Sequence, residues 1–149
     1  MATPTQIVRG LSSDRFGELL AACPKNFREE LFRRAGIKAK QSTFQLSSSG
    51  AKNKERSDKL HAAITGGLDL GDKLLEEVVR SYLYTRRDLL ADALDHLGVA
   101  HDRGLTDSDL SFVEALDEPR VAALRVHLAA KHPDGDVALY LAFMNVPGA

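Results

Sequence analysis

The sequence predicts an all-α fold, a compact bundle of about seven or eight short helices with one long basic loop. Apolar residues recur three and four positions apart through most of the chain, which is the period of one helix face. Alternation of apolar and polar residues, the pattern of a half-buried strand, occurs only briefly around Phe44 and Leu46. The sequence also has no repeat of fixed period, which argues against a solenoid.

The length and composition favour one domain, residues 1–149. A chain of this length buries about 70% of its unfolded surface in one core. Its 44% hydrophobic and 28% charged residues are typical of a globular protein rather than a disordered one. Because a single cysteine cannot form an internal disulfide, we expect a cytoplasmic protein. No apolar run reaches the ~18 residues of a membrane span, so no membrane partner is expected.

Two short helices are expected before residue 37. The first has Ser13 and Asp14 as candidate caps and is interrupted by Pro24, which suits the first turn of the second helix. The second helix ends at Gly36. The apolar positions of the first are Phe16, Leu19, Leu20 and Cys23, and those of the second are Phe27, Leu31 and Ala35.

Residues 37–56 have no helical period and are predicted to form a flexible basic loop. The stretch is rich in serine and lysine, and its only short apolar pattern is the pair Phe44 and Leu46. A segment of this length without regular structure is unusual in a small domain and is commonly functional.

Three helices are expected between residues 57 and 98. Helical spacing resumes near Ser57 and stops at Gly66, and the next helix starts between Asp69 and Asp72. The third covers residues 88–97 and ends before Gly98. The strongest apolar stripe belongs to the second of these helices and consists of Leu74, Leu75, Val78, Val79, Tyr82 and Leu83.

Three further helices are expected after residue 105. Thr106 is a candidate cap for residues 106–116, and Pro119 suits the first turn of the next helix, which is closed by Pro133. The last, residues 137–146, is apolar on every side, so it is either the central helix of the fold or part of a subunit interface. Its largest side chains are the candidate interface residues Tyr140, Phe143 and Met144.

The formal net charge of −1 conceals two oppositely charged parts. Residues 1–60 hold 12 Lys+Arg against six acids, a net charge of +6, and residues 61–149 hold eight against 15, a net charge of −7. The helical part that follows the loop, residues 57–149, is accordingly acidic. Such asymmetry indicates a charged partner, although the two parts could also face each other and neutralise within one fold.

Most of the positive charge surrounds the predicted loop. A cluster of cations there is the candidate partner-binding patch, and it comprises Arg33, Arg34, Lys38, Lys40, Lys52, Lys54 and Arg56. These side chains could follow a phosphate backbone, with Phe44 as a stacking surface. One aromatic residue in about twenty is sparse for single-strand recognition, so a solvated loop or an acidic protein partner is the favoured interpretation.

No motif in the sequence indicates catalysis, a cofactor or a metal centre. HExxH and Cys-x-x-Cys are missing, and residues 47–52 lack the Gly-Lys-Ser/Thr ending of a phosphate-binding loop. Asp92 and His96 are four residues apart and could share a proton or a metal, but a surface ion pair is favoured. Cys23 is expected in the core.

We therefore expect a non-enzymatic, adaptor-like module for protein–protein interaction or assembly, in which opposite-charge surfaces steer a protein partner or further copies of the chain. The alternative is a small helical nucleic-acid-binding accessory protein that uses the basic segment 33–59. A third alternative is an enzyme that uses His96 or His101 with Asp92 or Asp102.

Overall fold

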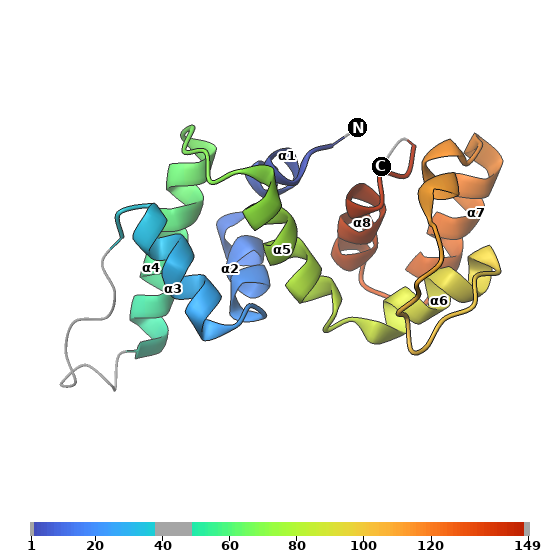
Figure 1. Ribbon diagram of the computed structural model, residues 1–149, viewed down its shortest axis with the longest axis horizontal. Coiled ribbons are helices and arrows are strands. Elements are labelled where there is room, and N and C mark those ends of the chain that lie inside the picture. The colour runs from blue at the N-terminus through green and yellow to red at the C-terminus, as the bar shows by residue number, and fades with distance from the viewer. Residues whose placement is uncertain (1, 38–48, 148–149) are drawn as a thin grey trace. The chain divides into compact units, whose positions relative to one another are not determined.

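The computed structural model describes residues 2–37 and 49–147, with the backbone alone for residues 49–53. Within these ranges the chain forms eight α-helices and one short 3₁₀ helix, and the only β-bridge is the isolated pair Asp102 and Leu105 (Figure 1). The predicted all-α fold is therefore confirmed.

The chain divides into two compact units, which are described separately below. The N-terminal unit comprises Thr3–Tyr82, and the C-terminal unit comprises Leu83–Ala149 together with the first two residues. The division falls at the end of α5 (Asp72–Leu83). That both units belong to one domain stays a prediction.

The N-terminal unit begins with a helix that apolar periodicity does not predict, α1 (Pro4–Arg9). Thr3 and Gln6 form a capping box: the Thr3 hydroxyl accepts from the Gln6 amide N–H at 3.2 Å, and the Gln6 side chain accepts from the Thr3 amide N–H at 2.9 Å. Pro4 occupies the first turn, where its missing N–H is harmless. Six residues are too few to display a period, so the Thr-x-x-Gln spacing is the signal for this helix.

The helices α2 (Ser13–Ala21) and α3 (Lys25–Arg34) follow the predicted ranges closely. The cap of α2 is Ser12 rather than the expected Ser13, because the Ser12 hydroxyl accepts from the Arg15 amide N–H. The large, fully buried side chains of this unit include Phe16, Leu19, Leu31, Leu60, Ile64 and Leu75.

The prediction of a loop over residues 37–56 is wrong for its last eight residues, because α4 (Ser49–Thr65) begins at Ser49. Charged side chains one turn apart support this first half of α4: Lys54 pairs with Asp58 at 2.9 Å, and Glu55 pairs with Lys59 at 3.2 Å. Such a helix is stabilised by polar pairs and therefore lacks the apolar stripe that periodicity detects. Residues 38–48 of the predicted loop lie outside the described residues.

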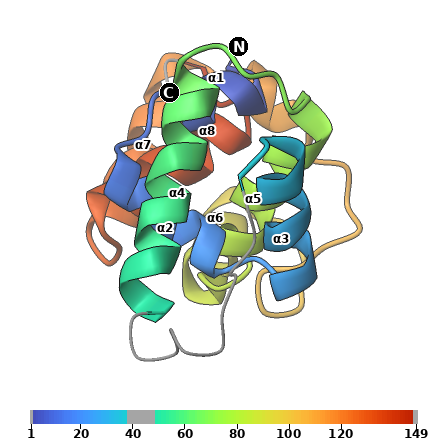
Figure 2. The same cartoon turned by 90° about the vertical axis from the view of Figure 1, so that its left-hand side faces the viewer.

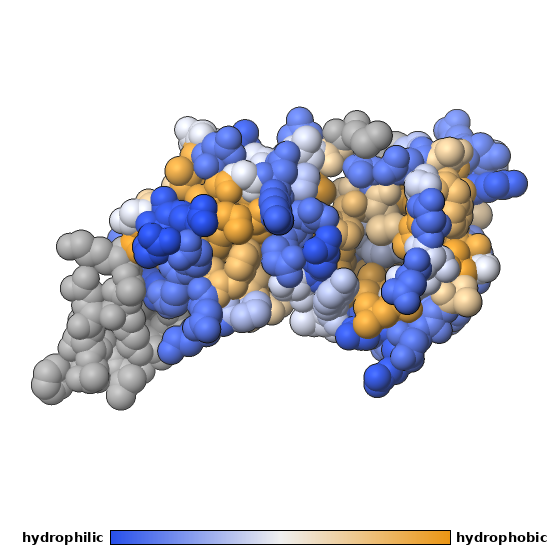
Figure 3. Space-filling view, in the orientation of Figure 1, coloured by the Kyte–Doolittle hydropathy of each residue, from blue (hydrophilic) through white to orange (hydrophobic). Residues whose placement is uncertain are grey.

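Within the N-terminal unit, α4 packs against α1 and α2, and Figure 2 shows α4 in front of α2 with α3 beside it. Figure 3 shows that, on the face it presents, apolar residues interrupt the hydrophilic surface around α3 and α5. The second half of α4 supplies Leu60 and Ile64 to the core, both fully buried.

The C-terminal unit contains α6 (Arg87–Leu97), α7 (Glu118–Ala129) and α8 (Asp134–Phe143), with α7 packed against both of the others. In α8 the side chains of Val137, Leu139 and Leu141 are buried. One ion pair also supports this helix, because Arg86 donates to the buried carboxylate of Asp136 at 3.0 Å.

The helix expected over residues 106–116 is reduced to η2 (Ser111–Ala115), a short 3₁₀ helix. Thr106 cannot cap a helix there, since its hydroxyl donates to the Ala100 carbonyl at 2.8 Å and accepts from the Ser108 amide N–H. The expected Thr106 cap is therefore wrong, and Asp109 instead accepts from the Ser111 amide N–H at 2.9 Å.

Among the described residues, no helix combines the length and the apolar character needed to cross a membrane.

Candidate functional site

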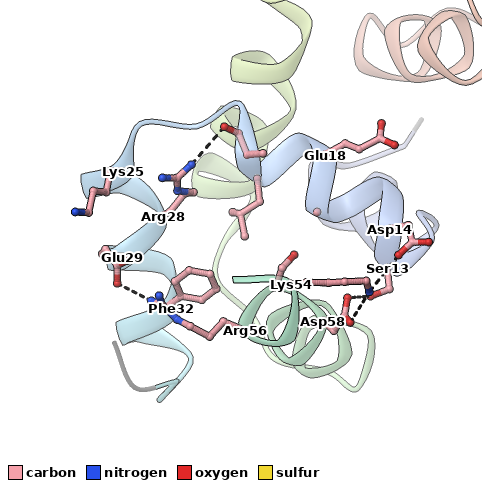
Figure 4. Close-up of a pocket in the computed structure, with 14 residues that line it drawn as sticks. Ser13, Asp14, Glu18, Lys25, Arg28, Glu29, Phe32, Lys54, Arg56 and Asp58 are labelled. Carbon is pink, nitrogen blue, oxygen red and sulfur yellow. Dashed lines mark hydrogen bonds and ion pairs between the residues drawn. The ribbon is translucent and has the colours of Figure 1, made fainter. Parts of the chain in front are cut away.

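The N-terminal unit contains a pocket of about 600 Å³ between α2, α3 and α4, referred to below as the α2–α4 pocket (Figure 4). Leu20 and Ala21 from α2 and Phe32 from α3 give it an apolar floor, and Arg56 and Ser57 form the wall on the α4 side. This volume lies in the range of ligand and side-chain binding sites, which combine apolar walls with a few polar groups.

Arg56 lies against the floor of this pocket rather than in solvent. Its guanidinium carbon is 4.1 Å from the centre of the Phe32 ring, and its Nη2 donates to Glu29 at 2.6 Å. The residue is only 9% exposed. Stacking of a guanidinium on an aromatic face, with a carboxylate at its end, fixes the Arg56 side chain in one orientation.

Two buried polar atoms of the wall have no hydrogen-bond partner in the described part of the chain: Arg56 Nε and Ser57 Oγ. Both residues line the α2–α4 pocket, and both are more than nine-tenths buried. Gly17 of α2 lies next to Ser57, because a methyl group built on Gly17 would lie 3.3 Å from the Ser57 hydroxyl. A buried donor without an acceptor is costly, so these two atoms favour an incoming acceptor.

The acids of the pocket all have cationic partners. Asp14 and Asp58 share Lys54, at 3.3 and 2.9 Å, and Ser13 donates to Asp58 at 2.5 Å. The hydrogen bonds from Ser13 and Lys54 hold the pKa of Asp58 below its ordinary value, so its carboxylate stays ionised. Glu18 pairs with Arg15 at 2.8 Å.

Two cations of the pocket have no acidic partner among the described residues: Lys25 and Arg28. Both lie in the first two turns of α3, and Arg28 donates to the Ala21 carbonyl at 3.3 Å. The first turn of α3 holds no acid, and its N-cap position, Pro24, has no side chain that caps. The exposed N–H groups of that turn add positive potential, so this end of the pocket favours an anion.

The structure divides the predicted basic patch. Lys54 and Arg56 lie in the α2–α4 pocket, while Arg33 and Arg34 both pair with Glu30, at 2.6 and 2.9 Å. Hydrogen bonds from these two arginines hold the pKa of Glu30 below its ordinary value. Lys38 and Lys40 lie outside the described residues, and Lys52 lies where the backbone alone is described.

Pairing with acids of the same unit reduces the charge that these cations offer to a phosphate backbone. Binding of nucleic acid through the basic segment 33–59 therefore gains no support from the described residues and stays a prediction. Sequence reasoning missed Lys25 and Arg28, although two cations without an acid at the start of a helix oppose the helix dipole and are a readable signal.

The predicted interface residues of α8 differ in exposure. Tyr140 is 3% exposed, and burial raises the pKa of its hydroxyl to about 12. Phe143 and Met144 are half-buried. Burial of Tyr140 within the single chain favours a core role for that residue.

The expected pairing of Asp92 with His96 is wrong. Asp92 pairs instead with His132 at 2.6 Å, and the His96 ring stacks on His127 with ring centres 4.7 Å apart. No group of three His, Cys, Asp or Glu residues suited to a metal occurs among the described residues. Cys23 is buried, as predicted.

The C-terminal unit carries an exposed acidic segment, residues 107–118, which contains five acids and neither lysine nor arginine. Of its acids, only Asp117 has a cationic partner among the described residues, Arg120 at 3.9 Å. Phe112, 42% exposed, lies in the middle of the segment on η2. An exposed aromatic ring between carboxylates is a surface that an apolar, cationic pocket complements.

No protein-family model, curated protein or solved structure matches this chain.

Proposed function

We propose that the chain is a non-enzymatic interaction and assembly module whose two units use opposite charge to select a protein partner, including further copies of the chain. The observation that supports this proposal is the charge of each unit. Thr3–Tyr82 holds 14 Lys+Arg and 10 Asp+Glu, a net charge of +4, whereas Leu83–Ala149 holds six and 11, a net charge of −5.

Each of the two structural units therefore has a net charge of its own sign. Opposite potentials on two surfaces accelerate the encounter of complementary partners and fix their relative orientation. Because the acidic segment 107–118 contains no lysine or arginine, most of its charge is available to a partner rather than neutralised locally. Surface charge that is paired within its own unit, as at Glu30, contributes less to recognition.

Sedimentation velocity at several protein concentrations and ionic strengths tests the proposal. Ionic strength is varied from about 0.01 M to about 1 M, over which the Debye length falls from about 30 Å to about 3 Å. We expect species heavier than the 16.3 kDa monomer at low salt and a return to monomer at high salt. A monomer at every concentration and ionic strength would contradict self-assembly.

A further inference from the structure

The short helix η2 places an exposed aromatic side chain next to buried apolar residues. Val113 is 1% exposed and Leu116 8% exposed, so these side chains anchor the segment in the C-terminal unit. Phe112 lies beside this anchor and remains 42% exposed, with Asp109 three residues before it and Glu114 two residues after it. The anchor directly after the ring reduces the entropy lost when a partner binds it.

The carboxylate of Asp109 is held in a defined position, because it accepts from the Ser111 amide N–H at 2.9 Å. The hydrogen bonds from Ser111, first from its backbone and then from its side chain, hold the pKa of Asp109 below the ordinary value. Asp109 and Glu114 have no cationic partner among the described residues. The segment therefore presents one aromatic ring between two carboxylates that no cation among the described residues neutralises.

The α2–α4 pocket offers the complementary groups. Its apolar floor consists of Leu20, Ala21 and Phe32, and an aromatic ring placed against such a floor buries apolar area. Its cations Lys25 and Arg28 lack acidic partners, and Arg56 Nε and Ser57 Oγ are buried donors without acceptors among the described residues. A carboxylate satisfies both needs, since it accepts hydrogen bonds and carries negative charge.

We propose that the acidic segment 107–118 of one copy of the chain docks in the α2–α4 pocket of a second copy. The Phe112 ring lies on the apolar floor, and the flanking carboxylates face Arg28 and the donors of the α4 wall. This inference rests on the proposed function and specifies its surfaces and its partner, a second copy.

The contact joins two different surfaces, one from each unit, so it is heterologous rather than two-fold symmetric. A copy whose pocket is occupied still has a free acidic segment, and a copy whose acidic segment is docked still has an empty pocket. Contacts of this type continue head to tail into a ring or an open chain, whose length increases with concentration.

Two single variants separate the two surfaces. Phe112→Ser removes the aromatic ring but leaves the pocket intact, and Arg28→Glu replaces with an acid one of the pocket's two cations that lack an acidic partner among the described residues, but leaves the segment intact. Phe112 is exposed and Arg28 is half-buried, so neither substitution removes a core side chain, and circular dichroism verifies the helical fold of each variant. We expect each variant alone to remain monomeric under conditions in which the wild type assembles.

An equimolar mixture of the two variants gives the decisive result. Each variant retains the surface that the other lacks, so we expect a species of twice the monomer mass and nothing larger. The dimer should dissociate as the ionic strength rises. A mixture that remains monomeric overturns the proposal, and so does a mixture that assembles beyond the dimer.

Matched controls come from the same units. Val126→Ser removes an exposed apolar side chain, 70% exposed, elsewhere in the C-terminal unit. Arg33→Glu makes the same charge change as Arg28→Glu on the same helix but outside the pocket. Both control variants should assemble like the wild type.

The two proposals fail in different ways. Wild-type protein that is monomeric at every concentration and ionic strength contradicts assembly as such. Wild-type protein that assembles, with Phe112→Ser and Arg28→Glu assembling equally well, leaves the proposed function standing and overturns this docking mode.

Discussion

Arg86 donates through Nε to Asp136 Oδ2 at 3.0 Å. Arg86 directly precedes α6, and Asp136 lies in the first turn of α8, so the pair links two helices of the C-terminal unit. Asp136 is only 2% exposed. A buried carboxylate is destabilising unless it is paired, and the N-terminus of α8 adds further favourable potential.

We predict that Arg86→Ala lowers the free energy of unfolding by about 2 kcal/mol, because a charged hydrogen bond to a buried acceptor is lost. Urea titration followed by circular dichroism measures the change. Arg120→Ala is the matched control, since Arg120 is exposed and lies 3.9 Å from Asp117, and it should cost less than about 0.5 kcal/mol. Equal stability losses in the two variants would show that the Arg86–Asp136 pair has no special importance.

Gly104 is a second position of the C-terminal unit at which we expect a substitution to be strongly destabilising. Its φ of +85° is in the left-handed region, and a methyl group there would lie 2.6 Å from the Leu90 Cβ atom of α6. Gly98 has a similar φ of +73° but nothing within 4 Å of an added methyl group.

We therefore predict that Gly104→Ala destabilises the protein by about 3 kcal/mol, from backbone strain and overpacking together. Gly98→Ala should cost about 1 kcal/mol, from strain alone. Thermal unfolding of the two variants in parallel measures the difference. A Gly104→Ala variant as stable as Gly98→Ala would mean that the loop moves away from α6 at no cost.

The hydrogen bonds at Asp58 predict a pH dependence. Ser13 and Lys54 hold its pKa in the folded protein below the ordinary value of 3.8, so the unfolded chain binds a proton more readily. The stabilisation is therefore complete above the unfolded pKa and is lost as the pH falls through the lower, folded pKa. We predict that the stability advantage of wild type over Asp58→Asn shrinks between about pH 5 and about pH 2.

Urea midpoints measured across this pH range for both proteins test the prediction. Glu55→Gln serves as the comparison, because it removes an exposed carboxylate of the same helix whose one cationic partner among the described side chains is Lys59. A gap between wild type and Asp58→Asn that stays constant with pH is the result that would count against the role of Asp58.

The parts of the fold that sequence predicts are those in which burial determines the pattern. The stripe from Leu74 to Leu83 corresponds to α5, and Gly98 ends α6 in the left-handed conformation that glycine allows. The first half of α4 fails this criterion, since Lys54 and Glu55 stabilise it through charge pairs instead of an apolar face. Helix α1 is not predicted by apolar periodicity because it has only six residues.

The candidate site was predictable only in part, because it depends on which charges meet in space. The sequence identifies Arg33 and Arg56 equally as cations of one patch. In the structure Arg33 pairs with Glu30 on its own helix, whereas Arg56 crosses from α4 to reach Glu29 and Phe32 on α3. Helical spacing predicts the first pair, but only the packing of α4 on the unit determines the second.

The same distinction explains the histidines of the C-terminal unit. Spacing of four residues on α6 suggests a partnership between Asp92 and His96, but His132, 40 residues away, takes Asp92. Spacing along one helix predicts an ion pair correctly only when no side chain of another helix or loop is a better partner.

Cys23 provides a final prediction, on chemical reactivity. The thiol is buried, and desolvation raises its pKa to about 11, against a weaker opposing effect from Ser81. Since the thiolate is the nucleophile, we predict that Cys23 reacts with a thiol reagent at pH 8 about 100-fold more slowly in the folded protein than in denaturant. The chain has one cysteine, so the denatured protein is its own control. Comparable rates in the two states would show that the α2–α3 corner opens readily, which would contradict the core role of Cys23.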